Sequence, residues 1–555
     1  MFKLSRQVKI LLLVFLLAFF LRTYRLSTFP FGFHADEVRV GWNAYSILKT
    51  GKDDRGNKFA LYYNTFGDFR PTGIFYLTIP SIAVFGTNEF AVRFPSALFG
   101  ALTVIPLYLF VKELAKKKKS NINHWPLAVT AGALLAVSPW HISVSRATSE
   151  VVVALFLALF GLYFFLRLLN EQKLKHALAS IALVATSYFF YHTVRVLAPI
   201  FIAAIILYSW KIISKTKIKK VILGVLGVLF IITLLFIQNK EARGRFSQVS
   251  IFSDLDVQYE LSRMPFEEGP NKVFIARLFH NKPSVYARHF INEYAKYFSS
   301  NFFLEDTTPK PTRYQTVGVG LLTYVGALLF VLGLVTIAQR KNSALPLLLL
   351  LLAPIPAAMT TEDAPNLHRA LFMLPFISII AAYGIGFLHS LTKKGKSVVI
   401  FAFLLLTFNL IFFLHMYFVH NKIHLPLYRN VGAKELALLL NEVQDNYDKI
   451  ILTNIPDDPY PWIAFFTGRD PRIFNQDAIA REQGVWTHEN FVFTGQRCPS
   501  RDAFEKPEVK RLLVVDAEGC ATESNLKDRE DVEILRRVLR PDESEVYIFW
   551  SRIEE

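Results

Sequence analysis

Asp36 and Glu37 form an adjacent pair of carboxylates that follows the first strongly apolar segment of the chain, residues 10–21. A carboxylate held at the end of such a segment can serve as a general base toward a hydroxyl group or as a metal ligand. The structural alternative is that Asp36 caps a helix and Glu37 complements the helix dipole, which contributes about 1 kcal/mol. The two roles are compatible, because capping also fixes the position of the carboxylate.

A second polar group lies in residues 138–150, between two apolar segments. Arg146 and Glu150 are four residues apart, so we expect both side chains on one face of the following helix. An ion pair at the helix end is the structural interpretation. Because Glu150 directly precedes an apolar run, a role in a functional site is the competing hypothesis.

Two further clusters combine histidine with arginine. His192 and Arg195 can bind a phosphate together, or Arg195 can extend from an aromatic belt toward water. His368 and Arg369 precede another apolar segment and suit an anionic headgroup, because arginine binds phosphate through two parallel hydrogen bonds. The alternative for this second pair is anchoring at a membrane interface.

The composition indicates a membrane protein. Of the 555 residues, 52% are hydrophobic and only 19% are charged, and long apolar runs recur over most of the chain. The net charge of +17 does not indicate nucleic-acid binding, because the lysines lie mainly in short loops between apolar runs. The first apolar segment resembles a signal peptide without a small-residue cleavage site, so we predict a retained signal-anchor helix.

We predict about eleven membrane-spanning helices, and the lysine-rich loops then all fall on one side, which is the cytoplasmic side. The N-terminus is therefore expected inside, and the loops 23–89 and 239–316 and the C-terminal region outside. Gly73 to Phe85 is too short for a span, so we predict an interfacial or re-entrant helix there. The predicted spans are residues 8–22, 90–112, 125–140, 149–168, 176–191, 196–213, 220–238, 317–338, 344–359, 369–390 and 397–419.

The composition changes at about residue 425, and we predict a small soluble α/β domain over residues 425–555. Its two cysteines, Cys498 and Cys520, are the only ones in the chain. They either form a disulfide or remain free thiols. The predicted elements are a helix over residues 431–443 and strands over residues 449–455, 511–516 and 545–550.

Taken together, these motifs resemble the membrane glycosyltransferases of the GT-C class. The resemblance is to the family 39-like group, which includes protein O-mannosyltransferases, aminoarabinose transferases and many bacterial relatives. It covers about residues 1–420. It rests on Asp36-Glu37 after the first helix, on the Ser-Pro-Trp-His…Ser-Arg…Glu segment of residues 138–150, on Tyr-His-Thr-Val-Arg at residues 191–195, and on the His-Arg pair of residues 368–369.

The resemblance implies the GT-C fold, a polytopic α-helical membrane protein, with residues 1–424 as the glycosyltransferase domain. It implies a polyprenyl-phosphate sugar as donor and transfer with inversion on the outer membrane face. Asp36 is then the expected catalytic base, Glu37 its support and Glu150 a second acid. The residues implied to hold the donor phosphate are Arg146, His192, Arg195, His368 and Arg369.

Several features of the expected reaction remain open. The acceptor is a glycan, a lipid or a protein, and residues 425–555 do not match the sugar-binding trefoil modules of eukaryotic protein mannosyltransferases. The class includes metal-dependent and metal-independent enzymes, and the absence of an Asp-x-Asp motif in the first loop favours the latter. We expect a multi-pass protein of a bacterial-type plasma membrane, in the cell envelope.

The outer loops are expected to contribute to such a site. Residues 36–51 predict a helix along the bilayer surface that ends at Gly51, with Trp42 and Tyr45 at the interface. Residues 283–298 predict a helix that begins behind a proline. The long loop 239–316 that contains this second helix is expected to form a lid or to face the acceptor.

Two other functions are compatible with part of the pattern. A transporter or flippase of lipid-linked sugars would also be polytopic, but its charges are expected near the midplane and its helices in inverted repeats, and neither is evident here. A non-catalytic membrane scaffold, with the C-terminal domain as its working part, is the second alternative. Unchanged glycans in an Asp36→Ala variant would favour the scaffold.

Overall fold

The computed structural model consists of two compact units, which we name the helical unit and the mixed unit. The helical unit comprises Met1–Tyr24, Leu61–Gly73 and Ser96–Met416, and the mixed unit comprises Arg25–Ala60, Ile74–Pro95 and Tyr417–Glu555. The residues that the structure describes are 5–65, 68–116, 125–238, 248–269, 273–304, 314–339, 344–391, 394–425, 427–453, 459–475, 486–494, 501–505, 509–517, 526 and 529–552.

The division differs from the predicted boundary between residues 424 and 425. Residues 25–60 and 74–89 of the first predicted outer loop, and residues 90–95 of the next predicted span, belong to the same compact unit as the C-terminal region. The physical reason is side-chain packing between segments far apart in sequence, which a change in composition does not reveal. The two cysteines, Cys498 and Cys520, lie outside the described residues, so the choice between a disulfide and free thiols stays open.

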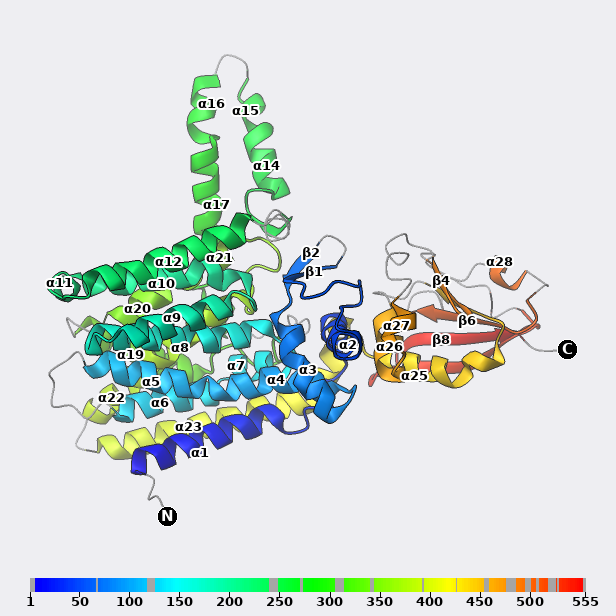
Figure 1. Ribbon diagram of the computed structural model, residues 1–555, viewed down its shortest axis with the longest axis horizontal. Helices are drawn as coiled ribbons and strands as arrows, with labels where there is room; N and C mark the ends of the chain where they lie inside the picture. Colours follow the sequence, from blue (N-terminus) through cyan, green and yellow to red (C-terminus); the bar gives the residue numbers. More distant parts are fainter. Residues whose placement is uncertain are drawn as a thin grey trace. The chain divides into compact units, whose positions relative to one another are not determined.

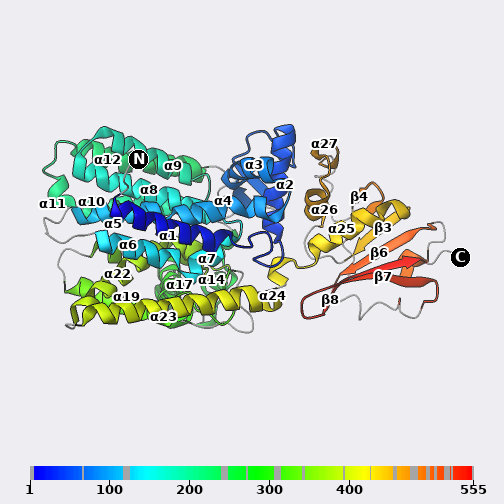
Figure 2. The same cartoon turned by 90° about the horizontal axis from the view of Figure 1, so that it is seen from below.

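The helical unit is a bundle whose long helices lie side by side (Figures 1 and 2). Its larger helices are α1 (Arg6–Thr23), α5 (Val104–Lys116), α6 (Trp125–Ala136), α7 (Pro139–Arg146), α8 (Glu150–Glu171), α9 (Leu174–Ser187), α10 (His192–Tyr208), α12 (Lys219–Gln238), α19 (Tyr324–Ala338), α20 (Leu345–Leu352), α22 (Leu374–Leu391) and α23 (Gly395–His415). Helix α4 (Glu89–Leu102) is divided between the two units after Pro95.

The smaller elements of the helical unit connect these helices. They are the hairpin β1 (Tyr62–Thr65) and β2 (Asp68–Pro71), α11 (Trp210–Ile213), α14 (Leu255–Ser262), α15 (Met264–Glu267), α16 (Val273–Phe279), α17 (Lys282–Lys296), α18 (Ser300–Leu304), α21 (Ile355–Ala358) and the 3-10 helix η2 (Arg369–Met373). The predicted helix over residues 283–298 thus corresponds to α17, which has a proline in its first turn.

Each of the predicted spans overlaps a described helix, but only some of these helices have the length of a membrane span. Among the described residues, five helices are long and apolar enough: Glu89–Lys116, Glu150–Glu171, Lys219–Gln238, Arg369–Leu391 and Gly395–His424. A sixth results if α6 and α7, which are bent by 55° at their junction, form one span. The chain is therefore a polytopic helical membrane protein, and the predicted count of eleven is not confirmed.

Helix packing inside the bundle depends on glycine where two backbones approach closely. Gly333 of α19 faces the backbone of Ile380, and Gly384 of α22 faces the backbone of Leu329, so neither position has room for a Cβ atom. Small residues of this kind allow helices to associate in a bilayer, where the hydrophobic effect does not drive one helix toward another. The α19–α22 pair is therefore joined through main-chain contacts.

The mixed unit contains a six-stranded sheet in the order β4-β5-β3-β6-β8-β7, in which β3 is parallel to both β5 and β6. Every residue of the inner strand β6 is buried, as expected for a strand covered on both faces. Its elements are α2 (Ala35–Thr50), α3 (Gly73–Phe85), the π-helical turn η3 (Met416–His420), α24 (Asn421–His424), η4 (Leu427–Arg429), α25 (Ala433–Val443), η5 (Gln444–Asn446), β3 (Lys449–Thr453), α26 (Tyr460–Thr467), α27 (Pro471–Phe474), β4 (Trp486–His488), β5 (Phe491–Thr494), α28 (Arg501–Phe504), β6 (Leu512–Ala517), β7 (Val532–Leu539) and β8 (Glu545–Arg552).

The sequence patterns located several elements of this unit. The predicted helix over residues 431–443 corresponds to α25, and the three predicted strands correspond to β3, β6 and β8. Helix α2 ends as predicted at Gly51, whose φ of 74° is a left-handed conformation that glycine adopts readily. Helix α3 coincides with the predicted short helix from Gly73 to Phe85.

A carboxylate is buried in the centre of this sheet. Asp516 of β6 accepts hydrogen bonds from the Thr453 hydroxyl at 2.8 Å and from the Trp550 indole at 3.0 Å. Burial raises the pKa of Asp516 to about 6, although both hydrogen bonds act in the opposite direction. The folded state thus binds a proton on Asp516 at pH values where the unfolded chain has released it.

We predict that replacing Gly384 by valine weakens the α19–α22 contact, because the added carbons overlap the Leu329 carbonyl. Overpacking of this kind costs about 1–3 kcal/mol. The matched control is Gly386→Val in the same helix, since nothing lies within 4 Å of a Cβ atom at that position. The thermal unfolding midpoint of the protein in detergent is the measurement, and an equal loss for both variants would contradict the packing argument.

We also predict a pH-dependent effect of Asp516→Asn. The folded-state pKa of Asp516 lies above the unfolded value of 3.8, so its stabilising contribution is lost as the pH rises from about 4 to 6. The unfolding midpoint of the variant should therefore rise relative to that of the native chain over this range. Asp448→Asn is the control, because the bond to Arg511 lowers the pKa of Asp448 and its effect belongs at lower pH.

Candidate active site

Helix α2 presents the carboxylate pair in its first turn. The N-cap is His34, whose Nδ1 accepts a hydrogen bond from the Asp36 backbone N–H at 3.0 Å. Glu37 completes a capping box, because its carboxylate accepts from the His34 backbone N–H at 3.2 Å. The prediction that Asp36 is the cap is therefore wrong. The preceding histidine supplies the acceptor, and Asp36 lies one residue inside the helix.

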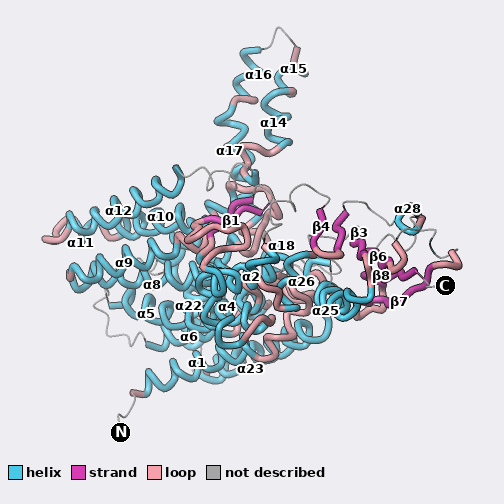
Figure 3. Tube along the Cα trace, turned by 45° about the vertical axis from the view of Figure 1, so that its right-hand side comes forward, coloured by secondary structure: helices cyan, strands magenta, loops and turns pink. Residues whose placement is uncertain are grey.

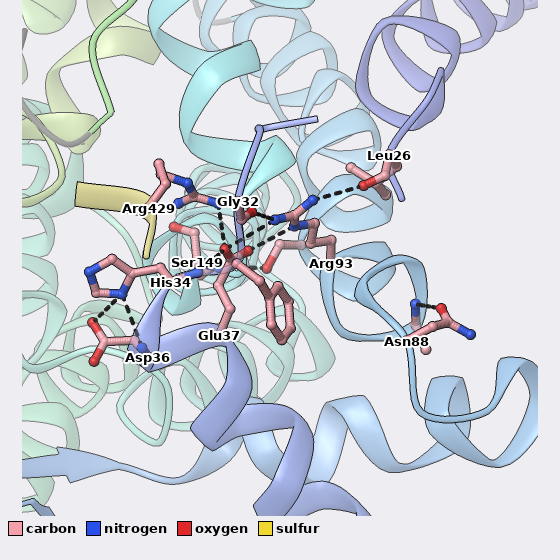
Figure 4. Close-up of polar contacts among 12 residues, drawn as sticks. Leu26, Gly32, His34, Asp36, Glu37, Asn88, Arg93, Ser149 and Arg429 are labelled. Atoms are coloured by element: carbon pink, nitrogen blue, oxygen red, sulfur yellow. Dashed lines mark hydrogen bonds and ion pairs between the residues drawn. The ribbon is translucent and has the colours of Figure 1, made fainter. Parts of the chain in front are cut away.

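Glu37 is held between two arginines (Figure 4). The Arg93 guanidinium donates to both of its carboxylate oxygens, at 3.0 and 3.3 Å. Arg429 donates to the Glu37 carboxylate at 2.5 Å from a segment almost four hundred residues away in sequence. Glu37, Arg93 and Arg429 are 1%, 0% and 2% exposed. A buried ion-pair triad therefore links the start of α2 to the segment that leads into α25.

The same arginines also fix the backbone before α2. Arg93 donates to the carbonyl oxygens of Leu26 at 3.1 Å and Gly32 at 2.5 Å. Gly32 has a φ of 80°, and a Cβ atom there would lie 2.5 Å from the Arg429 carbonyl, so this position requires glycine. Asn430 accepts a hydrogen bond from the Ala35 N–H at 3.0 Å. The chain that enters α2 is thus fixed from both sides.

Asp36 differs from Glu37 in its surroundings. Its side chain is 21% exposed, and the Arg39 guanidinium lies 3.9 Å from its carboxylate. His34 Nδ1 lies 3.6 Å from the carboxylate, but this nitrogen already accepts the Asp36 N–H and so has no proton to donate in that tautomer. Asp36 is therefore a partly exposed carboxylate on a rigid support, which suits general-base chemistry.

In the helical unit, a second constellation surrounds the start of α8. Ser149, the residue before α8, hydrogen-bonds through its hydroxyl to His368 Nε2 at 2.8 Å. The His368 ring stacks on Tyr314 with centroids 4.9 Å apart and meets Tyr191 edge-on at 5.4 Å. The predicted site residue Glu150 directly follows Ser149. The structure thus brings the start of α8, and with it Glu150, close to His368.

Arg369 extends from the same turn as His368. It donates to the Thr360 hydroxyl at 2.8 Å, to the Glu362 carbonyl at 2.9 Å and to the Glu362 carboxylate at 2.5 Å. Glu150 follows Ser149, whose hydroxyl contacts His368, and Arg369 is the next residue after His368. Glu150, His368 and Arg369 therefore belong to one local cluster, a mixture of one acid, one imidazole and one guanidinium.

Arg146 lies apart from this cluster. Its guanidinium is fully buried and donates to the carbonyl oxygens of Leu21 and Tyr24, both at 2.8 Å, at the C-terminal end of α1. The prediction that Arg146 and Glu150 share one helix face is wrong, because α7 ends at Arg146 and α8 begins at Glu150. Extended backbone at Ala147 separates the two helices.

His192 and Arg195 do meet, as their spacing predicts. Arg195 donates to His192 Nδ1 at 3.0 Å and to the Tyr188 carbonyl through two nitrogens, at 3.0 and 2.8 Å. The other His192 ring nitrogen bonds the Phe69 carbonyl at 3.2 Å, and the Arg195 guanidinium lies over the Tyr62 ring at 5.2 Å. In the described structure this pair joins α10 to the β1–β2 hairpin.

Arg93 and Arg429 were not identified from the sequence as partners of Glu37, nor was Ser149 identified as a partner of His368. A signal existed for Arg93, because it lies inside the predicted span 90–112, where a charge needs a partner or a function. Arg429 and Ser149 carried no such signal. In the part of the chain that the structure describes, no group of three or more His, Cys, Asp or Glu side chains is arranged to hold a metal ion.

We predict that Arg429→Met destabilises the folded protein strongly. Removing one partner of a buried ion pair costs about 3–5 kcal/mol, since the remaining charge keeps its desolvation penalty. The control is Arg529→Met, which removes an exposed pair with Asp531 and costs less than about 1 kcal/mol. Unfolding by denaturant in detergent provides the comparison, and equal effects would show that the triad does not hold α2.

Comparison with known proteins supports a common fold. Residues 70–237 match the family model described as dolichyl-phosphate-mannose-protein mannosyltransferase. The structure is similar to the crystal structure of ArnT from Cupriavidus metallidurans, with a TM-score of 0.51 and 12% identity over 98% of this chain and 97% of that one. ArnT has been solved in the apo state and bound to undecaprenyl phosphate. No curated protein sequence matches the chain.

A weaker similarity exists to the oligosaccharyltransferase AglB from Archaeoglobus fulgidus, with a TM-score of 0.49 and 14% identity over 83% of this chain. The chain spans only 64% of the length of AglB. The comparison therefore rests on the similarity to ArnT and on the family match over residues 70–237. The likeness to ArnT shows that the chain is a helical membrane protein with the GT-C fold, and part of it matches the mannosyltransferase family model.

Proposed function

We propose that this protein is a glycosyltransferase that moves a sugar from a polyprenyl-phosphate-linked donor to a hydroxyl or similar group of an acceptor. The observation that carries the proposal is Asp36, a partly exposed carboxylate whose helix is fixed by the buried Glu37–Arg93–Arg429 triad. Rigid support of this kind is what positioning a general base requires. The fold shared with ArnT, which binds undecaprenyl phosphate, is consistent with such a donor.

The proposed reaction is a single displacement with inversion at the anomeric carbon. The acceptor hydroxyl attacks this carbon while its proton passes to Asp36, and the bond between the anomeric carbon and the phosphate oxygen breaks. The bonding electrons leave with the polyprenyl phosphate. In this scheme Glu37 does not take the proton, because both of its oxygens accept hydrogen bonds from buried arginines, and it acts as a positioning residue.

We assign the donor phosphate to the cluster of His368 and Arg369, with Glu150 as its acidic member. Guanidinium and imidazole groups stabilise the negative charge that remains on a departing phosphate. The hydrogen bond from Ser149 orients the His368 ring for this role. We leave Arg146 out of the phosphate site, because its guanidinium holds the end of α1. We assign His192 and Arg195 a supporting role at the β1–β2 hairpin.

The proposal includes a location and an orientation. We propose a multi-pass protein of the plasma membrane, with a cytoplasmic N-terminus, because the lysine-rich loops between apolar segments are expected inside. The C-terminal region and both long loops would then be extracytoplasmic. The acceptor would be a glycan, lipid or protein of the cell envelope that reaches this face.

We predict that Asp36→Asn abolishes sugar transfer while the donor still binds. Loss of a general base lowers the rate by about 10²- to 10⁴-fold. The measurement is release of polyprenyl phosphate by the purified protein from a panel of labelled polyprenyl-phosphate sugars, with crude membrane acceptors added. Asp256→Asn, a change at an exposed carboxylate of α14, is the matched control.

The outcomes of this assay distinguish a glycosyltransferase from the alternative functions. Equal release by the native chain and Asp36→Asn would remove Asp36 from the chemistry and direct attention to Glu150. If the native chain releases polyprenyl phosphate from none of the donors, the glycosyltransferase proposal is contradicted. Movement of a labelled lipid between the leaflets of liposomes would then support the transporter alternative.

A further inference from the structure

The helical unit carries a projecting helical hairpin, α14 to α17, which we name the arm. In Figures 1 and 3 the arm extends away from the bundle, across the direction of the long helices. Its base is fixed by three hydrogen bonds: Ile251 N–H to the Met359 carbonyl at 3.0 Å, Thr361 N–H to the Val249 carbonyl at 3.0 Å, and the Tyr294 hydroxyl to the Leu351 carbonyl at 2.7 Å. The arm is therefore a built extension of the bundle.

The polarity of the arm is partly inverted relative to that of a water-soluble hairpin. Glu260 of α14 is only 8% exposed and bonds His280 at 3.4 Å and His289 at 3.0 Å across the two legs. Phe274 and Phe279 of α16, in contrast, are 82% and 58% exposed. In water, large aromatic side chains would be expected inside and charged groups outside. The reversed arrangement indicates apolar surroundings on the outer side of α16.

The exposed apolar side chains of α16 form one continuous face. Phe274 and Leu278 are four residues apart, as are Ile275 and Phe279, so the four side chains lie next to one another on the helix. Ala276, on the opposite side, is fully buried. The arrangement is that of an amphipathic helix whose apolar face has no protein partner among the described residues.

Charge distinguishes the two legs of the arm. The leg formed by α16 and α17 carries four basic residues, Arg277, Lys282, Arg288 and Lys296, and one acidic residue, Glu293. The leg formed by α14 and α15 is predominantly acidic, with Asp256, Glu260 and Glu267 among its residues. A helix with an apolar face and flanking lysine and arginine side chains has the properties of one that lies at an anionic bilayer surface.

The position of the arm in the chain also indicates that a bilayer surface is its partner. It follows α12, a helix apolar enough to span a membrane, on which Phe230, Ile231 and Leu235 are 54%, 57% and 62% exposed. These side chains form a lipid-facing surface of the bundle. Figure 1 places the arm beside the end of the bundle and crosswise to α12, so a bilayer around α12 would lie along the arm.

We propose that the arm is a bilayer-surface element. Phe274, Ile275, Leu278 and Phe279 insert among the lipids at that end of the bundle, and Arg277 and Lys282 contact lipid phosphates. The partner is an anionic phospholipid surface. This inference uses the membrane nature of the bundle alone and holds whether or not the protein transfers sugars.

The test is photocrosslinking in nanodiscs that contain anionic and zwitterionic phospholipids. A benzophenone amino acid replaces Phe274 or Phe279 in the full chain, and mass spectrometry identifies the adducts after irradiation. Phe230 of α12 is the lipid-facing control, and Asp256 of α14 is the control on the other leg. We expect lipid adducts at positions 274, 279 and 230, severalfold above those at position 256.

Two results would overturn the proposal. One is a lipid adduct at position 230 together with only background at positions 274 and 279. The other is crosslinking of these two positions to a protein in place of lipid. The charge contribution is tested separately by R277Q combined with K282Q, which should reduce the adducts at position 274 severalfold when the lipids are anionic and leave them unchanged when the lipids are neutral.

Discussion

The buried carboxylate of Glu37 is the interaction on which the mixed unit depends. It is an acceptor for Arg93, Arg429 and the backbone at the start of α2, and each donor comes from a different segment. Because the three charged side chains are nearly fully buried, each needs the others to offset the loss of hydration. Residues 25–60, residues 74–95 and the C-terminal region therefore form one compact unit, in which Asp36 has a fixed place.

Two carboxylates that are adjacent in sequence thus have different physical roles. Glu37 points into the protein and stabilises the fold, and Asp36 remains partly exposed. In the helical unit the division is similar: Arg146 fixes the end of α1, and the cluster of His368 and Arg369 gathers the groups suited to an anion. Charged side chains of the same type can therefore be fully buried or partly exposed, and the number and geometry of their partners distinguish the two cases.

The membrane imposes a second constraint, which acts on surfaces. The exposed apolar residues on α12 and on the arm fit contact with lipid, because contact with water would favour polar side chains at these positions. Inside the bundle, helices such as α19 and α22 associate through close backbone contact at glycines. The same chain thus uses small residues between helices, large apolar residues toward lipid and ion pairs in the region that contains α2.

Hydropathy alone indicated a polytopic helical protein, and local patterns located α2, α17, α25 and the strand β6, because these signals lie within one element. Asp36 and His368 were proposed as site residues from the sequence, and their roles stay predictions. Only the tertiary structure showed that residues 25–60 form one unit with the C-terminal region, and that Glu37 is a structural ion-pair partner. Those outcomes depend on contacts between distant segments, and a local pattern contains no information about which distant side chain will supply the opposite charge.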